Sequence, residues 1–261
     1  MARELTGLTP ITPITDPATL DALWLQAGVD AEAMIRDAGY VGLRADHLLH
    51  RGWPAEAVDW TLDTYRADTD ARRAALSLAR TLAADPDAFE AATGRAGLGL
   101  GGKPGRGKTG LACAVGAALL ARGQDVTFVR WGTLADDAFA ALGGRRERRG
   151  ANVPRFTAGG APVPGNADGL GAVTGPLAAV DVLIIDDLGE AGATSQPDLL
   201  RRVLREVLWP RYERRAVTLV TTNLPTGELE AQFGEAAVSR LSGLLRWVVV
   251  DGADERRGRA A

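Results

Sequence analysis

The sequence has 261 residues and a mass of 27.4 kDa, which is enough for one large domain with a small appendage. A formal net charge of −3 and a pI near 5.5 exclude a uniformly basic nucleic-acid-binding protein, so any site for a polyanion has to be a local patch. The single cysteine, Cys113, excludes an intramolecular disulfide and a zinc site built from cysteines.

Residues 1–94 are predicted to form a helical N-terminal region. Over residues 1–15, Thr, Pro and Ile alternate with little periodicity, which predicts an extended or mobile tail. Helical patterns with favourable first residues follow at Asp16, Asp30, Pro54 and Asp70. Three of the six tryptophans lie in this region, namely Trp24, Trp53 and Trp60. Core packing is the favoured interpretation for them, and a docking surface is the alternative.

From residue 95 to the end of the chain at 261, predicted strands alternate with predicted helices. This order is typical of an α/β domain with a parallel sheet and crossover helices. The expected strands are 97–101, 125–131, 180–185, 217–222 and 247–251. The expected helices are 108–122, 133–142 and 199–215. The sequence therefore predicts a five-stranded sheet flanked by helices.

Residues 143–179 interrupt this alternation with nine glycines and four prolines. The segment opens with an arginine cluster, Arg145, Arg146, Arg148 and Arg149. A stretch of this length without periodicity is usually functional or disordered. Two interpretations stay open here: a solvated insertion, and a basic loop that becomes ordered on DNA phosphates.

The only two lysines among thirty basic residues lie close together, at Lys103 and Lys108. Residues 102–109 fit G-x-x-x-x-G-K-[ST], the P-loop, whose backbone N–H groups surround nucleotide phosphates. A predicted strand precedes this loop and a predicted helix follows it, as the motif requires. The expected nucleotide-binding residues are Gly102, Lys103, Pro104, Gly105, Arg106, Gly107, Lys108, Thr109 and Gly110. Lys108 is expected to reach the β- and γ-phosphates, and the Thr109 hydroxyl to coordinate Mg²⁺.

Polar side chains follow the third and fourth predicted strands, 180–185 and 217–222, at their carboxyl ends. Asp186 and Asp187 end the apolar run 182–185, and open α/β sheets bind ligands at this edge. We expect Asp186 to hold Mg²⁺, and Asp187 to orient and deprotonate the attacking water. Asn223 ends the following strand, where its amide can donate to the γ-phosphate or to that water.

Arg240 lies on a predicted helix just before the last strand. Hydrolysis spreads negative charge over the transferred phosphoryl group, and a guanidinium supplied by another subunit stabilises that charge. Arg240 is therefore a candidate for a residue that acts in trans.

Taken together, these motifs resemble the AAA+ ATPases of the DnaC/IstB-like group. The resemblance covers roughly residues 95–257 and rests on the glycine loop, LIIDDLG, TTNLP, and SRL followed by VVVDGADERR; RYERR before the fourth strand is also similar. The group contains bacterial and phage replicative-helicase loaders and the ATPase helpers of insertion-sequence transposition. The resemblance implies that Asn223 is the sensor 1 residue, Arg240 the arginine finger, and Arg257, or alternatively Arg256, the sensor 2 residue.

The sequence departs from the group's wider AAA+ pattern in two respects. Asp187 stands where many AAA+ proteins have Glu, and its shorter stem is expected to slow hydrolysis. The chain stops too soon after the last strand for a helical lid domain, so closure over the nucleotide is expected from a neighbouring subunit.

The resemblance implies ATP and Mg²⁺ as cofactors and a homo-oligomer with composite ATP sites. It further implies a replicative DNA helicase and single-stranded DNA as partners, with the N-terminal region gripping the helicase. With neither a signal peptide nor an apolar run of roughly 18 residues, the expected location is cytoplasmic, with no membrane partner.

Two other functions remain open. One is a transposition helper of the same fold, and the other is an adaptor that binds ATP and DNA without useful turnover. A GTPase is disfavoured because the sequence has no Asn-Lys-x-Asp motif.

Overall fold

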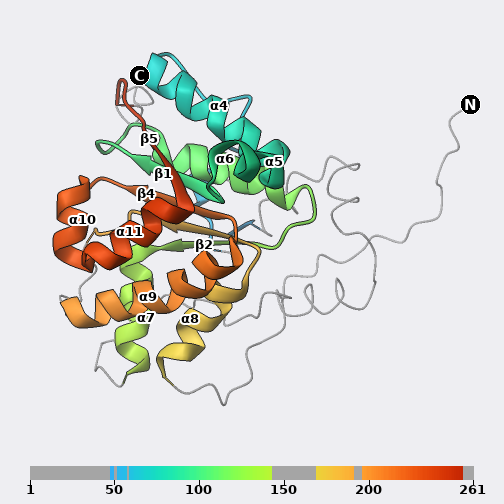
Figure 1. The fold of residues 1–261 in the computed structure, drawn as a ribbon. Helices are drawn as coiled ribbons and strands as arrows, with labels where there is room; N and C mark the ends of the chain where they lie inside the picture. Colours follow the sequence, from blue (N-terminus) through green and yellow to red (C-terminus); the bar gives the residue numbers. More distant parts are fainter. Residues whose placement is uncertain (1–47, 50–51, 58, 143–168, 191–195, 255–261) are drawn as a thin grey trace, which may run out of the picture.

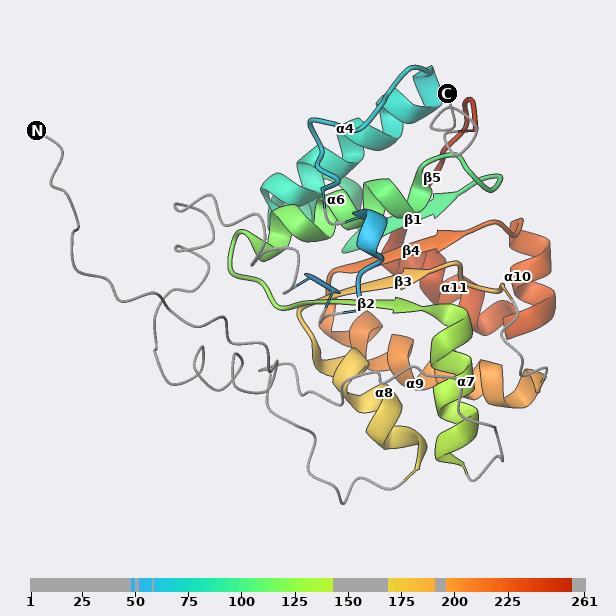
Figure 2. The ribbon, with the colours of Figure 1, turned by 180° about the vertical axis from the view of Figure 1, so that it is seen from behind.

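A computed structural model describes residues 48–49, 52–57, 59–142, 169–190 and 196–254. At its centre is a five-stranded sheet, all parallel, in the order β2-β3-β4-β1-β5 (Figures 1 and 2). The strands are β1 (Gly97–Gly101), β2 (Val126–Arg130), β3 (Val182–Asp186), β4 (Thr218–Thr222) and β5 (Leu245–Val249). The predicted α/β architecture is thereby confirmed.

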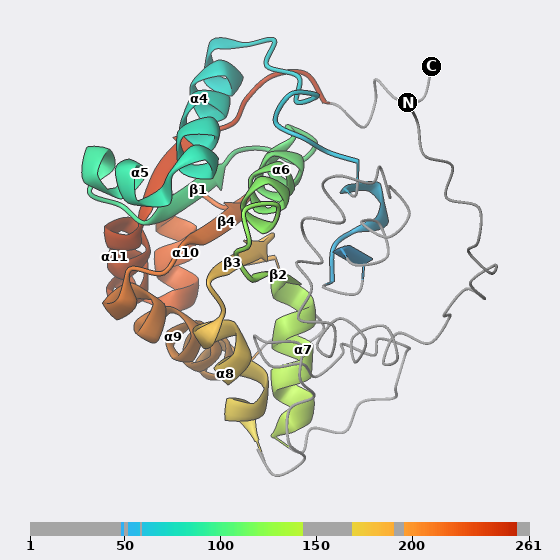
Figure 3. The same ribbon diagram turned by 90° about the vertical axis from the view of Figure 1, so that its right-hand side faces the viewer.

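Helices cover both faces of the sheet (Figure 3). One face carries α4 (Asp70–Ala84) and α6 (Lys108–Leu120), with α5 (Pro86–Thr93) beside α4. The other face carries α7 (Trp131–Ala141), α8 (Leu170–Ala179), α9 (Pro197–Arg214), α10 (Thr226–Phe233) and α11 (Glu235–Leu244). In the described part of the chain, no helix is long and apolar enough to cross a lipid bilayer.

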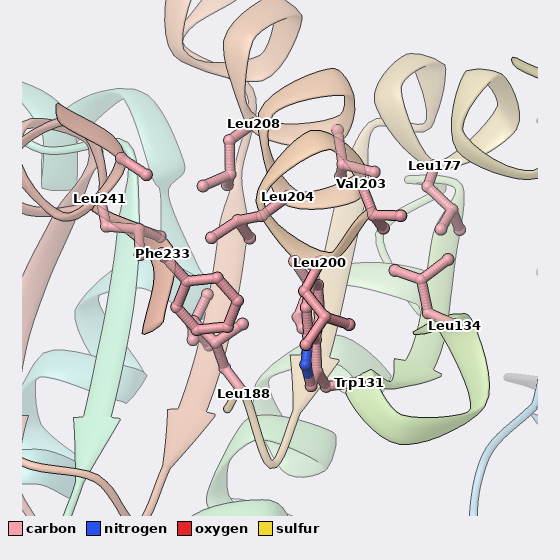
Figure 4. Packing of buried hydrophobic residues seen from close by; sticks show 14 of the residues in the cluster. Trp131, Leu134, Leu177, Leu188, Leu200, Val203, Leu204, Leu208, Phe233 and Leu241 are labelled. Atoms are coloured by element: carbon pink, nitrogen blue, oxygen red, sulfur yellow. The ribbon is translucent and has the colours of Figure 1, made fainter. Parts of the chain in front are cut away.

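Helix α9 forms the centre of the larger apolar core. Its inward face carries Leu200, Val203, Leu204 and Leu208, all buried against the sheet and neighbouring helices (Figure 4). Trp131 was predicted to end a strand, but it is the first residue of α7 and is fully buried. Its ring meets Phe233 edge to face at 5.2 Å, so this apolar contact decides where β2 ends and α7 begins.

The predicted helix after Pro54 is wrong. Only a short 3-10 turn forms, η1 (Ala55–Ala57), and the chain then runs through turns along α6. Trp53 is buried, and its ring lies against Gly116 of α6. Trp60 packs on Gly110, which lies nearer the start of the same helix. These two contacts hold the segment along α6. Core packing, the favoured interpretation of the tryptophans, holds for Trp53.

The stretch predicted to lack periodicity, 143–179, ends in a helix, α8. Helix α8 contains Gly171, Gly175 and Pro176, which obscure its pattern in the sequence. It packs extensively on α9, and the Thr174 hydroxyl donates to a carboxylate oxygen of Glu206 at 3.0 Å. Tertiary contacts therefore stabilise a helix that residue preferences alone do not favour.

Arg211, from the RYERR segment, joins α9 to the sheet. This side chain is fully buried and donates five hydrogen bonds of 2.6 to 3.1 Å, to the carbonyls of Leu177, Val180, Asp181 and Val217 and to Thr218 Oγ1. Burial, with a smaller contribution from Arg214, lowers the pKa of Arg211 to about 9.

The register of the strands brings three strand ends to one edge of the sheet. Gly101, the last residue of β1, pairs with Thr222, the last residue of β4, and Ile185 of β3 pairs with Val220. The residues that follow β1, β3 and β4 therefore lie together. The predictions for residues 1–47, for the arginine cluster at 145–149 and for Arg256 and Arg257 lie outside the described residues.

Candidate nucleotide-binding site

The loop between β1 and α6 has the backbone conformation that a phosphate-binding loop requires. Gly102, Gly105 and Gly107 have φ angles of 143°, 75° and 87°, which other L-residues rarely adopt. Helix α6 begins directly after Gly107, so its first N–H groups and the positive end of its dipole face the loop. This segment of the chain is therefore shaped to bind an anion.

Lys108 is buried, and its ammonium group closes the loop from within. It donates to the carbonyl oxygens of Gly102 and Lys103 at 2.8 and 2.9 Å, and to Asn223 Oδ1 at 2.5 Å. Lys103 itself is exposed, as is Pro104. Of the two lysines, the structure thus places Lys108 in the interior of the site and in contact with Asn223, the residue that follows β4.

Asp186 lies next to the first turn of α6. Its Oδ1 accepts hydrogen bonds from Thr109 Oγ1 at 2.8 Å and from Thr221 Oγ1 at 2.6 Å, and its side chain is 2% exposed. The hydroxyl and the carboxylate are the ligand pair that P-loop proteins offer to Mg²⁺ together with phosphate oxygens. Among the described residues, no group of three or more His, Cys, Asp or Glu side chains is arranged to hold a metal ion by itself. These two side chains fit a magnesium ion whose other ligands come from the nucleotide and water.

Asp187 follows β3 in a left-handed backbone conformation, with φ of 54°. Its N–H donates to Thr221 Oγ1 at 2.9 Å. Burial, then the charges of Asp186 and Glu190, raise the pKa of Asp187 to about 6. The carboxylate is therefore mostly ionised at neutral pH and more basic than usual, as a general base requires. Asp tolerates positive φ more readily than Glu does, which accounts for Asp at this position.

Asn223 links Lys108 to Glu190. Its Oδ1 accepts from Lys108 Nζ, and its Nδ2 donates to Glu190 Oε1. Glu190 lies three residues beyond Asp187, in a turn closed by the bond from Glu190 N to Asp187 O at 3.0 Å. Glu190 belongs to no motif in the sequence, so it was not predicted as a site residue; the approach of the β3 and β4 ends in space brings it to the site.

Arg106, in the loop, directs its side chain away from the phosphate cradle. Its guanidinium donates to the carbonyl of Gly252 and lies 3.6 Å from the carboxylate of Asp251. A Cβ atom added at Gly105 would clash with the carboxylate of Asp254, so this acid lies directly over the loop. The segment after β5 is therefore part of the site.

Arg72 of α4 fixes the same segment and was also missed from the sequence. It is buried, and it donates to the carbonyls of Arg106 and Ala253 at 3.3 and 2.7 Å and to Asp68 at 2.8 Å. The hydrogen bond from Arg72 holds the pKa of the Asp68 carboxyl below its ordinary value. Helix α4, the glycine loop and the C-terminal segment are joined through one guanidinium.

The structure does not bring Arg240 to the nucleotide-binding site of its own chain. Arg240 lies on α11, where its guanidinium carbon is 3.4 Å from the ring centroid of Trp209 and Nη1 donates to the carbonyl of Ala236 at 3.1 Å. None of its described contacts involves the glycine loop, Asp186, Asp187 or Asn223. In this structure Arg240 is therefore not part of the site formed by its own chain.

Comparison with known proteins identifies a distant relative. No protein-family model matches the chain. A Sinorhizobium fredii protein, described as an insertion sequence ATP-binding protein, is 31% identical over 138 residues, which make up 53% of this chain. The matched region spans 37% of that relative's length.

Solved structures establish the fold. The DnaC helicase loader superposes with a TM-score of 0.56 and 21% identity, covering 75% of this chain and 99% of that one. DnaI superposes with a TM-score of 0.54 and 20% identity, covering 79% of this chain and 99% of that one. The replication initiator DnaA bound to AMPPCP and single-stranded DNA superposes with a TM-score of 0.55 and 16% identity, covering 76% of this chain and 51% of that one. This chain has the fold of the DnaC helicase loader and of DnaI.

Proposed function

We propose that this protein is a magnesium-dependent ATPase of the helicase-loader type, which assembles on or near single-stranded DNA and delivers or remodels a replicative helicase. The observation that carries the ATPase part is the joined pair Thr109 and Asp186, with Lys108 inside the glycine loop and hydrogen bonded to Asn223. Because single-stranded DNA and a replicative helicase are the proposed partners, the proposed location is the cytoplasm.

The residues of one subunit divide the work of binding and hydrolysis. The loop amides and Lys108 bind the phosphates, with Lys108 exchanging its carbonyl partners for phosphate oxygens. Thr109 and Asp186 would hold Mg²⁺, which would supply positive charge beside the phosphates. Asp187 orients the attacking water and takes its proton. Asn223 turns its amide from Glu190 toward the terminal phosphate.

A neighbouring subunit completes the site in this proposal. Its Arg240 donates to the transferred phosphoryl group, where such a guanidinium contributes roughly 10³–10⁵ in rate. ATP therefore holds two copies of the chain together, and hydrolysis weakens their contact. The nucleotide acts as an assembly switch with turnover as its reset. Arg257, or Arg256, serves as sensor 2, and the N-terminal region 1–94 docks the client.

A transposition helper is the second candidate. The Sinorhizobium fredii relative supports it, since that protein is described as an insertion sequence ATP-binding protein. Both candidates use the same nucleotide chemistry, so the client alone separates them.

Two measurements test the proposal with purified proteins. ATP turnover by the full chain is measured with and without single-stranded DNA, and we expect Arg240→Ala to bind ATP but not to hydrolyse it. Absence of turnover under every condition would favour a non-hydrolysing adaptor. Co-sedimentation with a bacterial replicative helicase is then compared with co-sedimentation with an insertion-sequence transposase. Binding of the transposase alone would replace the loader by the transposition helper.

A further inference from the structure

We propose that Trp209 is a positioning residue for hydrolysis, which holds the Arg240 guanidinium ready for the nucleotide of a neighbouring subunit. This inference rests on the proposed function, because it assigns a support to the residue proposed to act in trans. The primary observation is the stacked contact: the guanidinium carbon of Arg240 lies 3.4 Å from the ring centroid of Trp209. At that distance the guanidinium lies against the indole face, where the attraction between cation and ring is strong.

Few of the N–H donors of Arg240 are used by the described residues. Within the described residues, its guanidinium makes one hydrogen bond, to the carbonyl of Ala236, and no ion pair. On the adjacent helix α9, Arg201 and Arg202 pair with Asp198 and Glu206 instead. Arg240 is half-buried, has five N–H donors and meets no carboxylate of the described residues, so most of its donor capacity is not used by them and suits an acceptor on another subunit.

The packing of two helices produces this contact. Helices α9 and α11 lie side by side (Figures 1 and 3). One turn beyond the stacked pair, Gly243 faces Tyr212, and a Cβ atom at 243 would lie 2.9 Å from Cε2 of that tyrosine. Both helices advance by three residues between the two contacts, which shows that they run in the same direction. The close approach at Gly243 sets the distance that lets Arg240 lie flat on Trp209.

Stacking restricts the guanidinium without occupying its donors. An indole face attracts the cation but accepts no conventional hydrogen bond, so the in-plane N–H groups stay available for phosphate oxygens. A carboxylate in the same place would hold the arginine equally well but would neutralise it and occupy its donors. Trp209 precedes Pro210 within the helix, a position where a helical backbone is disfavoured. A locally unfavourable sequence of this kind is expected where function requires it.

The test uses Trp209→Leu, with Trp209→Phe as the matched control. We expect leucine to lower kcat about tenfold with little change in KM, because ATP binding by the same subunit does not involve Trp209. Phenylalanine keeps a ring face and should retain most of the activity. Trp209→Gln repeats the test if the leucine variant does not fold, since glutamine suits a half-exposed helix position.

Mixing variants separates positioning in trans from a merely structural role. Trp209→Leu mixed with Asp187→Asn should regain activity, because the second variant supplies a well-held Arg240 to the intact base of the first. Trp209→Leu mixed with Arg240→Ala should regain none, because neither supplies a well-held arginine. The reverse pattern, or equal recovery in both mixtures, overturns the inference.

The same experiment distinguishes failure of the inference from failure of the proposed function. Should Arg240→Ala hydrolyse ATP at the unmodified rate, the arginine has no catalytic role, and the completion of the site by a neighbouring subunit in the proposed function is overturned along with this inference. Should Arg240→Ala be inactive while Trp209→Leu keeps full kcat, the arginine acts without its platform, and only the present inference is wrong.

Discussion

The hydroxyl of Thr109 lies 2.8 Å from Oδ1 of Asp186 and donates a hydrogen bond to it. The two residues are 77 positions apart in the sequence, at the start of α6 and at the end of β3. This bond joins the glycine loop to the neighbouring strand end. It also preorganises the two side chains that we assign to Mg²⁺, so binding the metal requires little rearrangement of either element.

Thr109→Val should remove the magnesium-dependent part of ATP affinity. Valine keeps the branched shape but offers no oxygen to the metal, so we expect affinity to fall about tenfold in Mg²⁺ and to change little in EDTA. Titration with a fluorescent ATP analogue under both conditions provides the measurement, and Thr109→Ser, which keeps the hydroxyl, is the control. An equal loss in EDTA would assign the hydroxyl to the structure of the loop instead.

Lys108→Met should weaken ATP binding by roughly 10- to 100-fold, since it removes charge-assisted hydrogen bonds to phosphate. The chain offers a matched control, because its only other lysine, Lys103, is exposed in the same loop. Lys103→Met should bind nearly as the unmodified protein does in an equilibrium titration. Similar losses in the two variants would mean that general electrostatic attraction, and not the buried ammonium group, binds the phosphates.

The sheet and the nucleotide loop could be predicted because each depends on local sequence. The apolar run before Asp186 and the glycines from 102 to 107 specify a buried strand and a tight loop wherever they occur. Strand order then brings the predicted polar ends together, and the contacts of Asp186 and Asn223 follow from that topology.

The remainder depends on contacts between distant segments. Helix α8 forms because α9 covers it, and the segment after Pro54 follows α6 because two indoles pack on glycines of that helix. Glu190 and Arg72 enter the site through partners that no pattern in the sequence connects with them. Residue preferences carry no information about such contacts, which explains why these features were missed.

Asp187→Asn should stabilise the protein at neutral pH while it lowers turnover. The folded-state pKa of Asp187, about 6, exceeds its ordinary value of 3.8, so the folded state binds the proton more tightly and stability decreases as pH rises between these values. Asparagine does not ionise, so it removes the free-energy cost of holding a charged Asp187 in the folded state, which is about 1–2 kcal/mol above pH 6 once solvent screening is allowed for. Asparagine also tolerates the left-handed backbone at this position. Thermal unfolding at pH 7.5 measures the gain, which should vanish near pH 4. A lower melting temperature at pH 7.5 would contradict the assigned penalty.

Turnover should follow the ionisation of Asp187. Because the protonated acid cannot accept a proton from water, kcat/KM is expected to rise with pH up to about 6 and to level off above it. The charge of Glu190 contributes to the raised pKa, so Glu190→Gln should move the rising limb to lower pH. A pH–rate profile of each form is the measurement. An unmoved limb in the Gln variant would show that Glu190 does not act on the group that titrates.

Asp254→Asn should strengthen ATP binding. The carboxylate of Asp254 lies over Gly105, so it repels the phosphates that the loop amides attract. Removing one charge at this position should raise affinity by about threefold to tenfold, with a smaller gain at high salt, because screening already weakens the repulsion. Asp251→Asn is the control, since Asp251 is largely exposed and its carboxylate lies toward Arg106. Isothermal titration with ATP at low and high salt distinguishes the outcomes. Weaker ATP binding by the Asp254 variant would contradict this prediction. It would mean that Asp254 supports the glycine loop, and that the segment after β5 promotes nucleotide binding by lying over Gly105.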